Sequence, residues 1–139
     1  PSESTIGEAA PPLAELADPE ALIHVGGPVQ QQAIVVLGEF DEPERAGVLV
    51  FGTVGFLPGE IEDAAELGEL TRVRVFAGYA GWGPGQLEDE LEESSWIVEP
   101  ALPDDVFTTD PDDLWSAVLR RKGGHYALVA RMPPDPSLN

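Results

Sequence analysis

The stretch Arg72-Val73-Arg74-Val75-Phe76-Ala77 alternates charged and apolar side chains, and it runs directly into the glycine-rich segment Gly78–Gly85 (GYAGWGPG). Successive side chains of a β-strand point to opposite faces, so Val73, Val75 and Ala77 would share one face. The pattern predicts a strand at 72–77. It is the clearest strand signal in the chain, and the other elements are placed relative to it.

The glycine-rich segment predicts a shaped loop followed by a helix. Its four glycines allow backbone conformations that are closed to other residues. Pro84 has a φ angle suited to a helix start, and the acidic residues 88–90 complement the positive end of a helix. Leu87 and Leu91 lie at i,i+4 and supply one apolar face. We therefore expect a helix that runs to about Ser94.

Further strands are predicted where short apolar or β-branched runs end at glycine or proline. These runs are Ala21–Val25, Ala33–Leu37, Val48–Phe51, Trp96–Val98 and His125–Met132, with a shorter one at Val106–Phe107. Because β character returns repeatedly along the chain, we expect most of these runs to join a common sheet.

Helical signals separate the predicted strands. They cover Ile6–Ala10 capped by Thr5, one or two turns at Leu13–Ala17, a short amphipathic helix at Glu60–Leu70, and a helix that Thr109 or Asp110 caps and Arg120–Lys122 ends before Gly123. Helices between strands predict a mixed sheet with helices packed outside it, in a single domain over residues 1–139.

Composition and charge exclude several classes of function. The chain has 139 residues with 26 acidic against 7 basic side chains, a formal net charge of −19. Such a chain repels the phosphate backbone, so direct nucleic-acid binding is disfavoured. It has no cysteine, which removes disulfides, thiolate metal sites and thiol nucleophiles and fits a cytoplasmic location. No apolar run approaches the roughly 20 residues needed to cross a bilayer, so we expect no membrane segment.

The usual catalytic and cofactor patterns are missing. No glycine turn with a lysine forms a phosphate loop, and Lys122 at a predicted helix end complements the helix dipole. His24 and His125 are far apart in the sequence, and Glu88 with Glu92 lacks the spacing of a calcium loop. We therefore expect no cofactor, no metal and no catalytic residue.

The one feature that exceeds structural need is the glycine-and-aromatic corner. Gly78, Tyr79, Gly81 and Trp82 lie between a predicted strand end and a predicted helix start, a position where free N–H groups collect and a small anionic or amide-bearing ligand would fit. The candidate surface continues into the helix and includes a second glycine turn: its other members are Gln86, Glu88, Gly26, Gly27 and Pro28. The alternative is that the two rings fold inward and cap the core, while the glycines only permit turns.

The chain resembles the YqgE/AlgH family, and the match spans nearly its whole length in order. The motifs that carry it are Val25–Val29 (VGGPV), Gly78–Trp82 (GYAGW), Gly85–Glu88 (GQLE), Trp96–Val98, Asp113–Trp115 and the ending Asp135–Asn139 (DPSLN). The resemblance implies a cytoplasmic bacterial protein with an α+β fold, in which a mixed and partly barrel-like sheet is flanked by helices. It implies little chemistry, since the label of transcriptional regulator that some members carry comes with no DNA-binding motif and no assigned catalytic residues.

One departure from the family pattern concerns the start of the chain. Similar proteins begin with a further segment of strands that ends in a stretch like Asn-Arg-Pro-Ser, whereas this sequence opens at Pro1-Ser2-Glu3. We expect the natural protein to carry that segment, because a sheet without it would expose edges that invite pairing with another chain.

These observations favour a non-enzymatic protein that binds a protein partner or a small ligand through the glycine-and-aromatic corner. A second hypothesis is an effect on transcription, which at this net charge would pass through another protein. A third is an enzyme that uses Glu88 with Asp89 in a closed groove.

Overall fold

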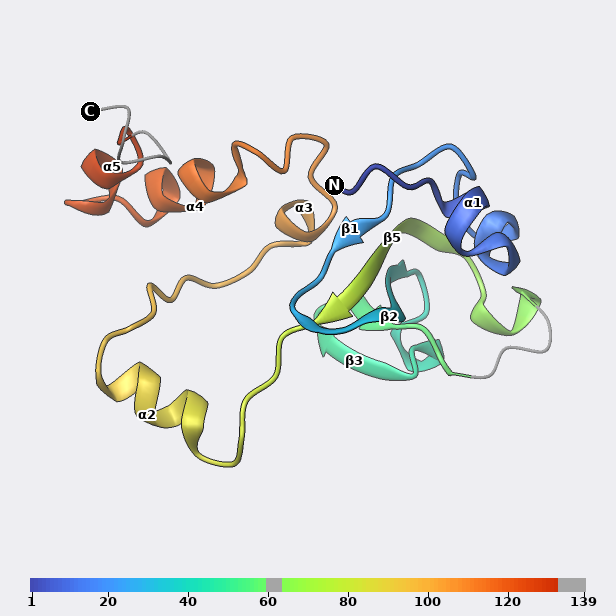
Figure 1. Cartoon of the computed structure of the whole chain (residues 1–139), viewed down its shortest axis with the longest axis horizontal. Coiled ribbons are helices and arrows are strands. Elements are labelled where there is room, and N and C mark those ends of the chain that lie inside the picture. The colour runs from blue at the N-terminus through green and yellow to red at the C-terminus, as the bar shows by residue number, and fades with distance from the viewer. Residues whose placement is uncertain (60–63, 133–139) are drawn as a thin grey trace. The chain divides into compact units, whose positions relative to one another are not determined.

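The computed structural model describes residues 1–59 and 64–132. The chain divides into two compact units, Pro1–Trp96 and Ile97–Asn139. Figure 1 shows the sheet in the first unit and the later helices in the second.

A five-stranded sheet organises the first unit, with the strand order β1-β5-β2-β4-β3. Its strands are β1 (His24–Val25), β2 (Val29–Phe40), β3 (Val48–Phe51), β4 (Val54–Phe56) and β5 (Leu70–Tyr79). β1 runs parallel to β5 and the other pairs are antiparallel, so the sheet is mixed. The predicted α+β class is confirmed. Within the described residues the sheet ends at β1 and β3 and does not close into a barrel.

The predicted strand at 72–77 forms the middle of β5, which pairs with both β1 and β2. Val75 is 1% exposed and belongs to the core, with Val73 and Ala77 packed against it. On the alternate positions, Arg72 Nε lies 2.6 Å from Glu39 Oε2 of the neighbouring β2. The alternation in the sequence therefore predicted correctly that Val73, Val75 and Ala77 share the face of β5 that packs on the core.

The core of the first unit forms between the sheet and the N-terminal helices. Ile6, Ile23 and Val75 are buried together, and Leu13 and Val36 pack against them. Ile6 begins α1 (Ile6–Ala9), which has the predicted Thr5 cap in the form of a capping box with Glu8. The helical turn expected at Leu13–Ala17 is a 3-10 helix, η1 (Pro11–Glu15), because the two prolines start it earlier.

The second unit is helical, with α3 (Pro103–Val106), α4 (Leu114–Lys122) and α5 (Tyr126–Val129). Arg121 on α4 donates to both carboxylate oxygens of Asp105 on α3, at 2.8 and 2.7 Å. Lys122 Nζ donates to the carbonyl oxygen of Val98 at 2.7 Å. The basic end of α4 thus fastens this helix to the two segments that precede it.

Three strand predictions in the later sequence are wrong. Trp96–Val98 has no strand structure, Val106 ends α3, and the region of His125–Met132 contains α5. A short β-branched run becomes a strand only when a partner strand takes its backbone groups. Within residues 97–132 the structure contains no strand to act as that partner, and the Val98 carbonyl is bonded by Lys122 instead.

One strand that the sequence did not predict and several element boundaries account for the other differences. β4 was not predicted, because Gly52 and Gly55 read as breakers; Gly52, at φ +53°, instead forms the turn between β3 and β4. In the helix predicted for Glu60–Leu70, residues 60–63 lie outside the described residues, η3 (Ala64–Leu67) is a 3-10 helix, and Leu70 begins β5. The helix expected after Thr109 or Asp110 begins only at Leu114.

Candidate functional site

The two glycine segments singled out in the sequence lie against each other in the first unit. β1 leads into Gly26, whose N–H donates to the carbonyl of Ala77 at 2.9 Å. A Cβ atom on Gly26 would overlap the carbonyl of Gly78, and one on Gly78 would lie 2.6 Å from the carbonyl oxygen of Gly27. Gly78 is buried and has φ +75°. These glycines therefore let two backbones approach closely, while Pro28 beyond them is exposed.

Tyr79 and Trp82 follow on the exposed side of that contact. Tyr79 ends β5, so the loop predicted at 78–85 starts two residues later than expected. The two residues are 38% and 40% exposed, so neither is enclosed in the core. Gly81 lies between them, and a Cβ there would make only an ordinary 3.7 Å contact with Tyr79. The crowding that requires glycine is thus confined to the strand end.

A single carboxylate accepts hydrogen bonds from three side chains of the loop, of α2 and of the segment after it. Glu90 lies on α2 (Gln86–Glu92), and its Oε2 accepts from the indole N–H of Trp82 at 3.0 Å and of Trp96 at 2.8 Å. Its Oε1 accepts from Gln86 Nε2 at 2.9 Å. The two indoles make an edge-to-face contact, with centroids 5.8 Å apart at 66°. We call Trp82, Gln86, Glu90 and Trp96 the aromatic corner.

The hydrogen bonds also fix the charge at the centre of the aromatic corner. Donation from Trp96, then from Gln86 and Trp82, lowers the pKa of Glu90 below its ordinary value of 4.5. Glu90 is therefore an anion at neutral pH. Gln86 has a further role, because its Oε1 accepts from the N–H of Gly83 at 3.1 Å and ties the loop to the helix.

An anionic ligand at the start of α2, which the sequence suggested, does not fit this arrangement. The N–H of Gly83 is already bonded to Gln86, and the first turn carries Glu88 and Asp89, both exposed. With Glu90 one residue further on, an anion would meet three carboxylates. A helix of seven residues offers too small a dipole to offset that repulsion.

Glu88 does not contribute to the aromatic corner through any described hydrogen bond, although the sequence placed it in the candidate surface. It and Asp89 are exposed on α2. General acid–base catalysis by carboxylates favours a closed, water-poor setting, and neither side chain has one.

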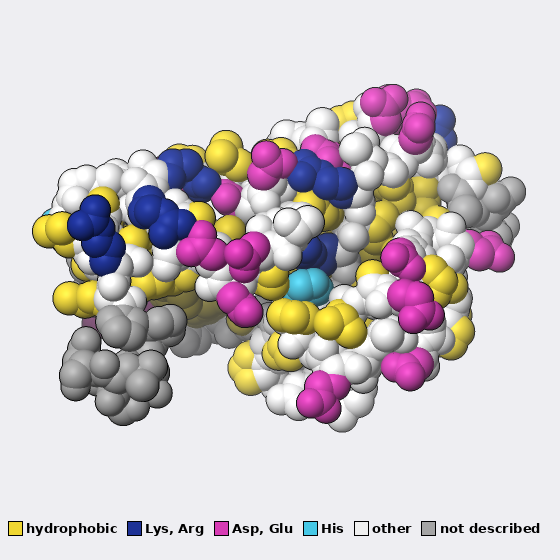
Figure 2. All heavy atoms as spheres, turned by 90° about the horizontal axis from the view of Figure 1, so that it is seen from above, with side chains coloured by type: hydrophobic (Ala, Val, Ile, Leu, Met, Phe, Trp, Pro, Cys, Tyr) yellow, Lys and Arg dark blue, Asp and Glu magenta, His cyan; other side chains and the backbone are white. Residues whose placement is uncertain are grey.

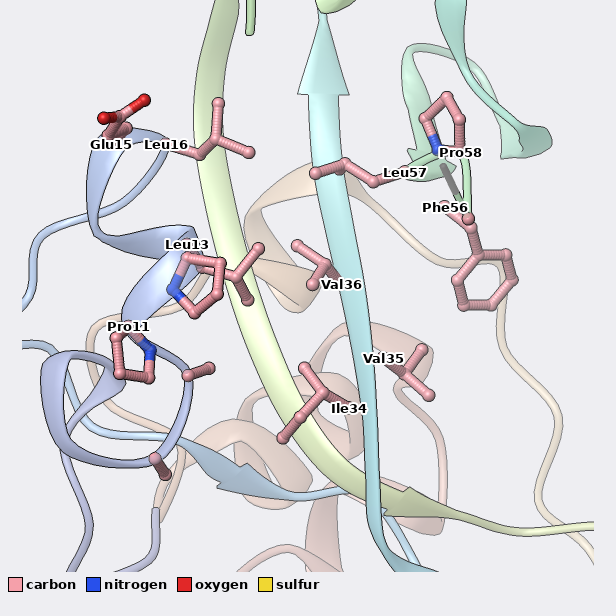
Figure 3. A pocket seen from close by; sticks show the side chains of 14 residues that line it. Pro11, Leu13, Glu15, Leu16, Ile34, Val35, Val36, Phe56, Leu57 and Pro58 are labelled. Carbon is pink, nitrogen blue, oxygen red and sulfur yellow. The ribbon is translucent and has the colours of Figure 1, made fainter. Parts of the chain in front are cut away.

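The first unit also contains an apolar pocket of about 660 Å³. No residue of the aromatic corner is among its described lining residues. Figure 3 shows side chains of η1, β2 and the segment after β4 around it, with Leu13 and Val36 pointing toward one another. Glu15 is the one charged residue among its described lining residues. The pocket was not predicted, because its walls come from three segments distant in sequence.

Within residues 1–59 and 64–132, no group of three or more His, Asp or Glu side chains could hold a metal ion. In the same residues no helix has the length and apolarity to cross a membrane. His24, one of the two histidines of the sequence, has its ring centroid 5.9 Å from that of Phe76. Burial lowers its pKa, and the positive charge of Arg74 lowers it further.

Two members of the aromatic corner were missed in the sequence. The sequence pattern places Glu90 only in the acidic first turn of a predicted helix, and it places Trp96 in a predicted strand. The i,i+4 spacing of Gln86 and Glu90 indicates that their side chains lie on one helix face. Nothing local predicts that Trp96 returns to the same carboxylate, since that contact depends on the path of the chain after α2.

The family model described as AlgH-like matches residues 1–127, which include the whole aromatic corner. The chain belongs to the AlgH-like family. Among AlgH-like relatives, a UPF0301 protein of Thermobifida fusca is 41% identical over 154 residues, covering 100% of this chain and 75% of the relative. A UPF0301 protein of Streptomyces coelicolor is 39% identical, with the same two coverages.

Solved structures support the AlgH-like fold. The crystal structure of a Corynebacterium diphtheriae protein matches with a TM-score of 0.79 at 28% identity, covering 94% of this chain and 71% of that one. The solution structure of the AlgH protein from Pseudomonas aeruginosa matches with a TM-score of 0.63 at 29% identity, covering 97% and 75%. The names of these relatives state no ligand and no reaction.

Proposed function

We propose that this AlgH-like protein is a non-catalytic cytoplasmic binding protein that meets a protein partner at its aromatic corner. The observation that carries the proposal is the position of Glu90, whose carboxylate accepts from both partly exposed indoles. These bonds hold Trp82 and Trp96 at the surface in one arrangement.

Rings held in this way are suited to an interface. Tryptophan and tyrosine are enriched at protein interfaces because they bury a large area and lose few rotatable bonds. Trp82 is 40% and Trp96 48% exposed, and Tyr79 at the end of β5 is 38% exposed. Because the indoles are already fixed by Glu90, a partner pays little further entropy to order them.

A protein surface is favoured over a small molecule as the partner. Small-ligand sites are concave and enclose most of the ligand. The lining residues of the described pocket come from α1, η1, β2, β4 and the segments next to them, and no residue of the aromatic corner is among them. The aromatic corner instead presents partly exposed rings beside an acidic helix.

An effect on transcription is the second candidate, and we propose that it would act through another protein. The net charge is −19, and Figure 2 shows acidic side chains at several places on the surface, together with basic ones. The basic cluster at the end of α4 is already engaged: Arg120 pairs with Asp113 at 2.6 Å, Arg121 with Asp105, and Lys122 with the Val98 carbonyl. Such engagement leaves little positive potential for a phosphate backbone.

The test is a comparative capture experiment with the full-length natural protein. The bait proteins are wild type, Trp82→Ala and Trp115→Ala, and captured proteins and metabolites are identified by mass spectrometry. Trp115 is 48% exposed and belongs to the second unit, so it is a matched control for the loss of an exposed indole. We expect Trp82→Ala alone to lose a partner that wild type retains. A partner retained equally by all three proteins would contradict the proposal, provided that circular dichroism shows each variant to be folded.

A further inference from the structure

We propose that the aromatic corner recognises a cationic side chain, a guanidinium or ammonium group presented by a basic segment of the partner protein. The inference rests on the proposed function and names the chemical group that the partner contributes. It follows from the two indoles, from the hydrogen-bond capacity of Glu90 and from the charge of α2.

The indole pair offers π surface to a cation. In the edge-to-face contact of Trp82 and Trp96 each ring keeps an exposed part, at 40% and 48% for the two residues. Cations bind over the face of an aromatic ring, tryptophan most strongly and arginine most often. Because both indole N–H groups donate to an anion, the rings are polarised in the direction that strengthens this attraction.

Glu90 also retains one place for a donor. A carboxylate has about four lone-pair sites. Both sites of Oε2 are taken by the indoles of Trp82 and Trp96, and one site of Oε1 is taken by Gln86. The remaining site on Oε1 can accept one N–H from a guanidinium or ammonium group beside the rings, and such charge-assisted bonds are the strong ones.

The surroundings supply charge complementarity. Exposed carboxylates on and just after α2 belong to Glu88, Asp89, Glu92 and Glu93. The sequence has no Lys or Arg between Arg74 and Arg120, so this segment carries no cation of its own. A wholly apolar partner would bury the Glu90 charge without a counter-ion, at a large desolvation cost, whereas a basic segment would bring one.

The binding test uses defined peptides and the intrinsic fluorescence of the aromatic corner. In a Trp115→Phe background, only Trp82 and Trp96 remain as tryptophans. The probe is a capped hexapeptide of alternating glycine and arginine, compared with a lysine version and with a version in which neutral citrulline replaces arginine. We expect saturable fluorescence changes with a cationic peptide and at least about ten-fold weaker binding of the citrulline peptide. Equal binding of the three peptides, or no binding of the cationic ones, would overturn the inference.

A matched pair of variants separates Glu90 from the general acidity of the helix. Glu90→Gln and Glu92→Gln each remove one negative charge from α2, but only Glu90 bonds the indoles. We expect Glu90→Gln to weaken binding of the arginine peptide by about ten-fold, and Glu92→Gln to weaken it by about two-fold or less. Equal losses would show a diffuse acidic surface and overturn the inference.

Because Glu90→Gln also changes an indole acceptor, Trp82→Phe serves as a second variant. It keeps an aromatic face and leaves Glu90 charged, and we expect it to retain the preference for arginine over citrulline. Loss of that preference in a folded Trp82→Phe protein with an unchanged Trp96 signal would count against recognition by Glu90. The two proposals can fail separately. If Trp82→Ala loses the natural partner but citrulline binds like arginine, only the cationic inference fails; if the partner is retained while the peptides are distinguished, the proposed function fails.

Discussion

The carbonyl oxygen of Gly27 lies 2.6 Å from the place that a Cβ atom on Gly78 would occupy. Gly78 also has φ +75°, so glycine is required there both by backbone conformation and by space. This contact joins β5 to the turn that follows β1, and the loop that carries Trp82 starts two residues later. The position of the aromatic corner therefore depends on two backbones that approach without side chains between them.

We expect Gly78→Ala to lower the free energy of unfolding by about 3 kcal/mol or more. The added Cβ atom would make the positive φ unfavourable, and it would also force neighbouring backbone atoms to move. Gly52→Ala is the matched control. Gly52 also has a positive φ, +53°, but nothing lies within 4 Å of its Cβ position, so only the conformational cost of about 1–2 kcal/mol applies. Urea unfolding measures both values. Equal losses would show that crowding by Gly27 contributes nothing.

The hydrogen bonds that Glu90 accepts in the aromatic corner should persist at mildly acidic pH. The pKa of Glu90 is lowered, first by the bond from Trp96 and then by those from Gln86 and Trp82. A lowered folded pKa means that the stabilising bonds are fully present above the ordinary value of 4.5 and are lost as pH falls through the folded value. We expect the indole N–H resonances of Trp82 and Trp96 to stay constant from pH 7 to 4.5 and to shift together below it.

The control for this titration is the indole N–H of Trp115, which belongs to the second unit. A common acid transition of all three indoles would indicate global unfolding. If the Trp82 and Trp96 signals moved above pH 4.5 while Trp115 stayed constant, Glu90 would not be the group that holds them.

The sheet could be predicted from the sequence where a local pattern and a partner strand agree. The alternation at 72–77 and the β-branched run at Ala33–Leu37 both lie in strands that pair with each other. Trp96–Val98 has the same local character but no partner strand. β-Propensity reports how a side chain fits a sheet, and it carries no information on whether the sheet reaches that segment.

The candidate site was predictable in part, for a similar reason. The glycines and Trp82 follow from local backbone freedom and from their place between a strand and a helix. Whether the ring would be buried or exposed depended on Glu90 and Trp96, six residues apart. That hydrogen bond is set by the turn after α2, where Ser94 has φ +58°, and no sequence signal indicated a left-handed serine there.

The core of the first unit gives a stability prediction. Val75 is 1% exposed and packs with Ile6 and Ile23, so Val75→Ala removes two buried methyl groups and leaves a cavity. We expect a loss of about 2–3 kcal/mol in the free energy of unfolding. Val25→Ala is the control, since Val25 on β1 is 70% exposed and should cost less than about 0.5 kcal/mol. Comparable losses, measured by urea unfolding, would contradict the assigned core.

The second unit should depend on Asp105 more than on Asp113, although each pairs with an arginine of α4. Asp105 accepts two bonds from Arg121, which, with the backbone N–H of Leu102, lower its pKa. Its side chain is 18% exposed, whereas that of Asp113 is 49% exposed. Asp113→Asn should therefore change stability by less than about 0.5 kcal/mol, and Asp105→Asn should cost several times as much. A lowered pKa of Asp105 stabilises the folded protein at pH values above the ordinary value of 3.8, and this stabilisation is lost as pH falls below it. The difference in stability between the two variants should therefore shrink in acid.

Thermal unfolding at pH 7 and pH 3 measures this difference. It is followed by Trp115 fluorescence in a Trp82→Phe, Trp96→Phe background. A difference between the variants that grows in acid would contradict the stabilising role of the Asp105–Arg121 pair.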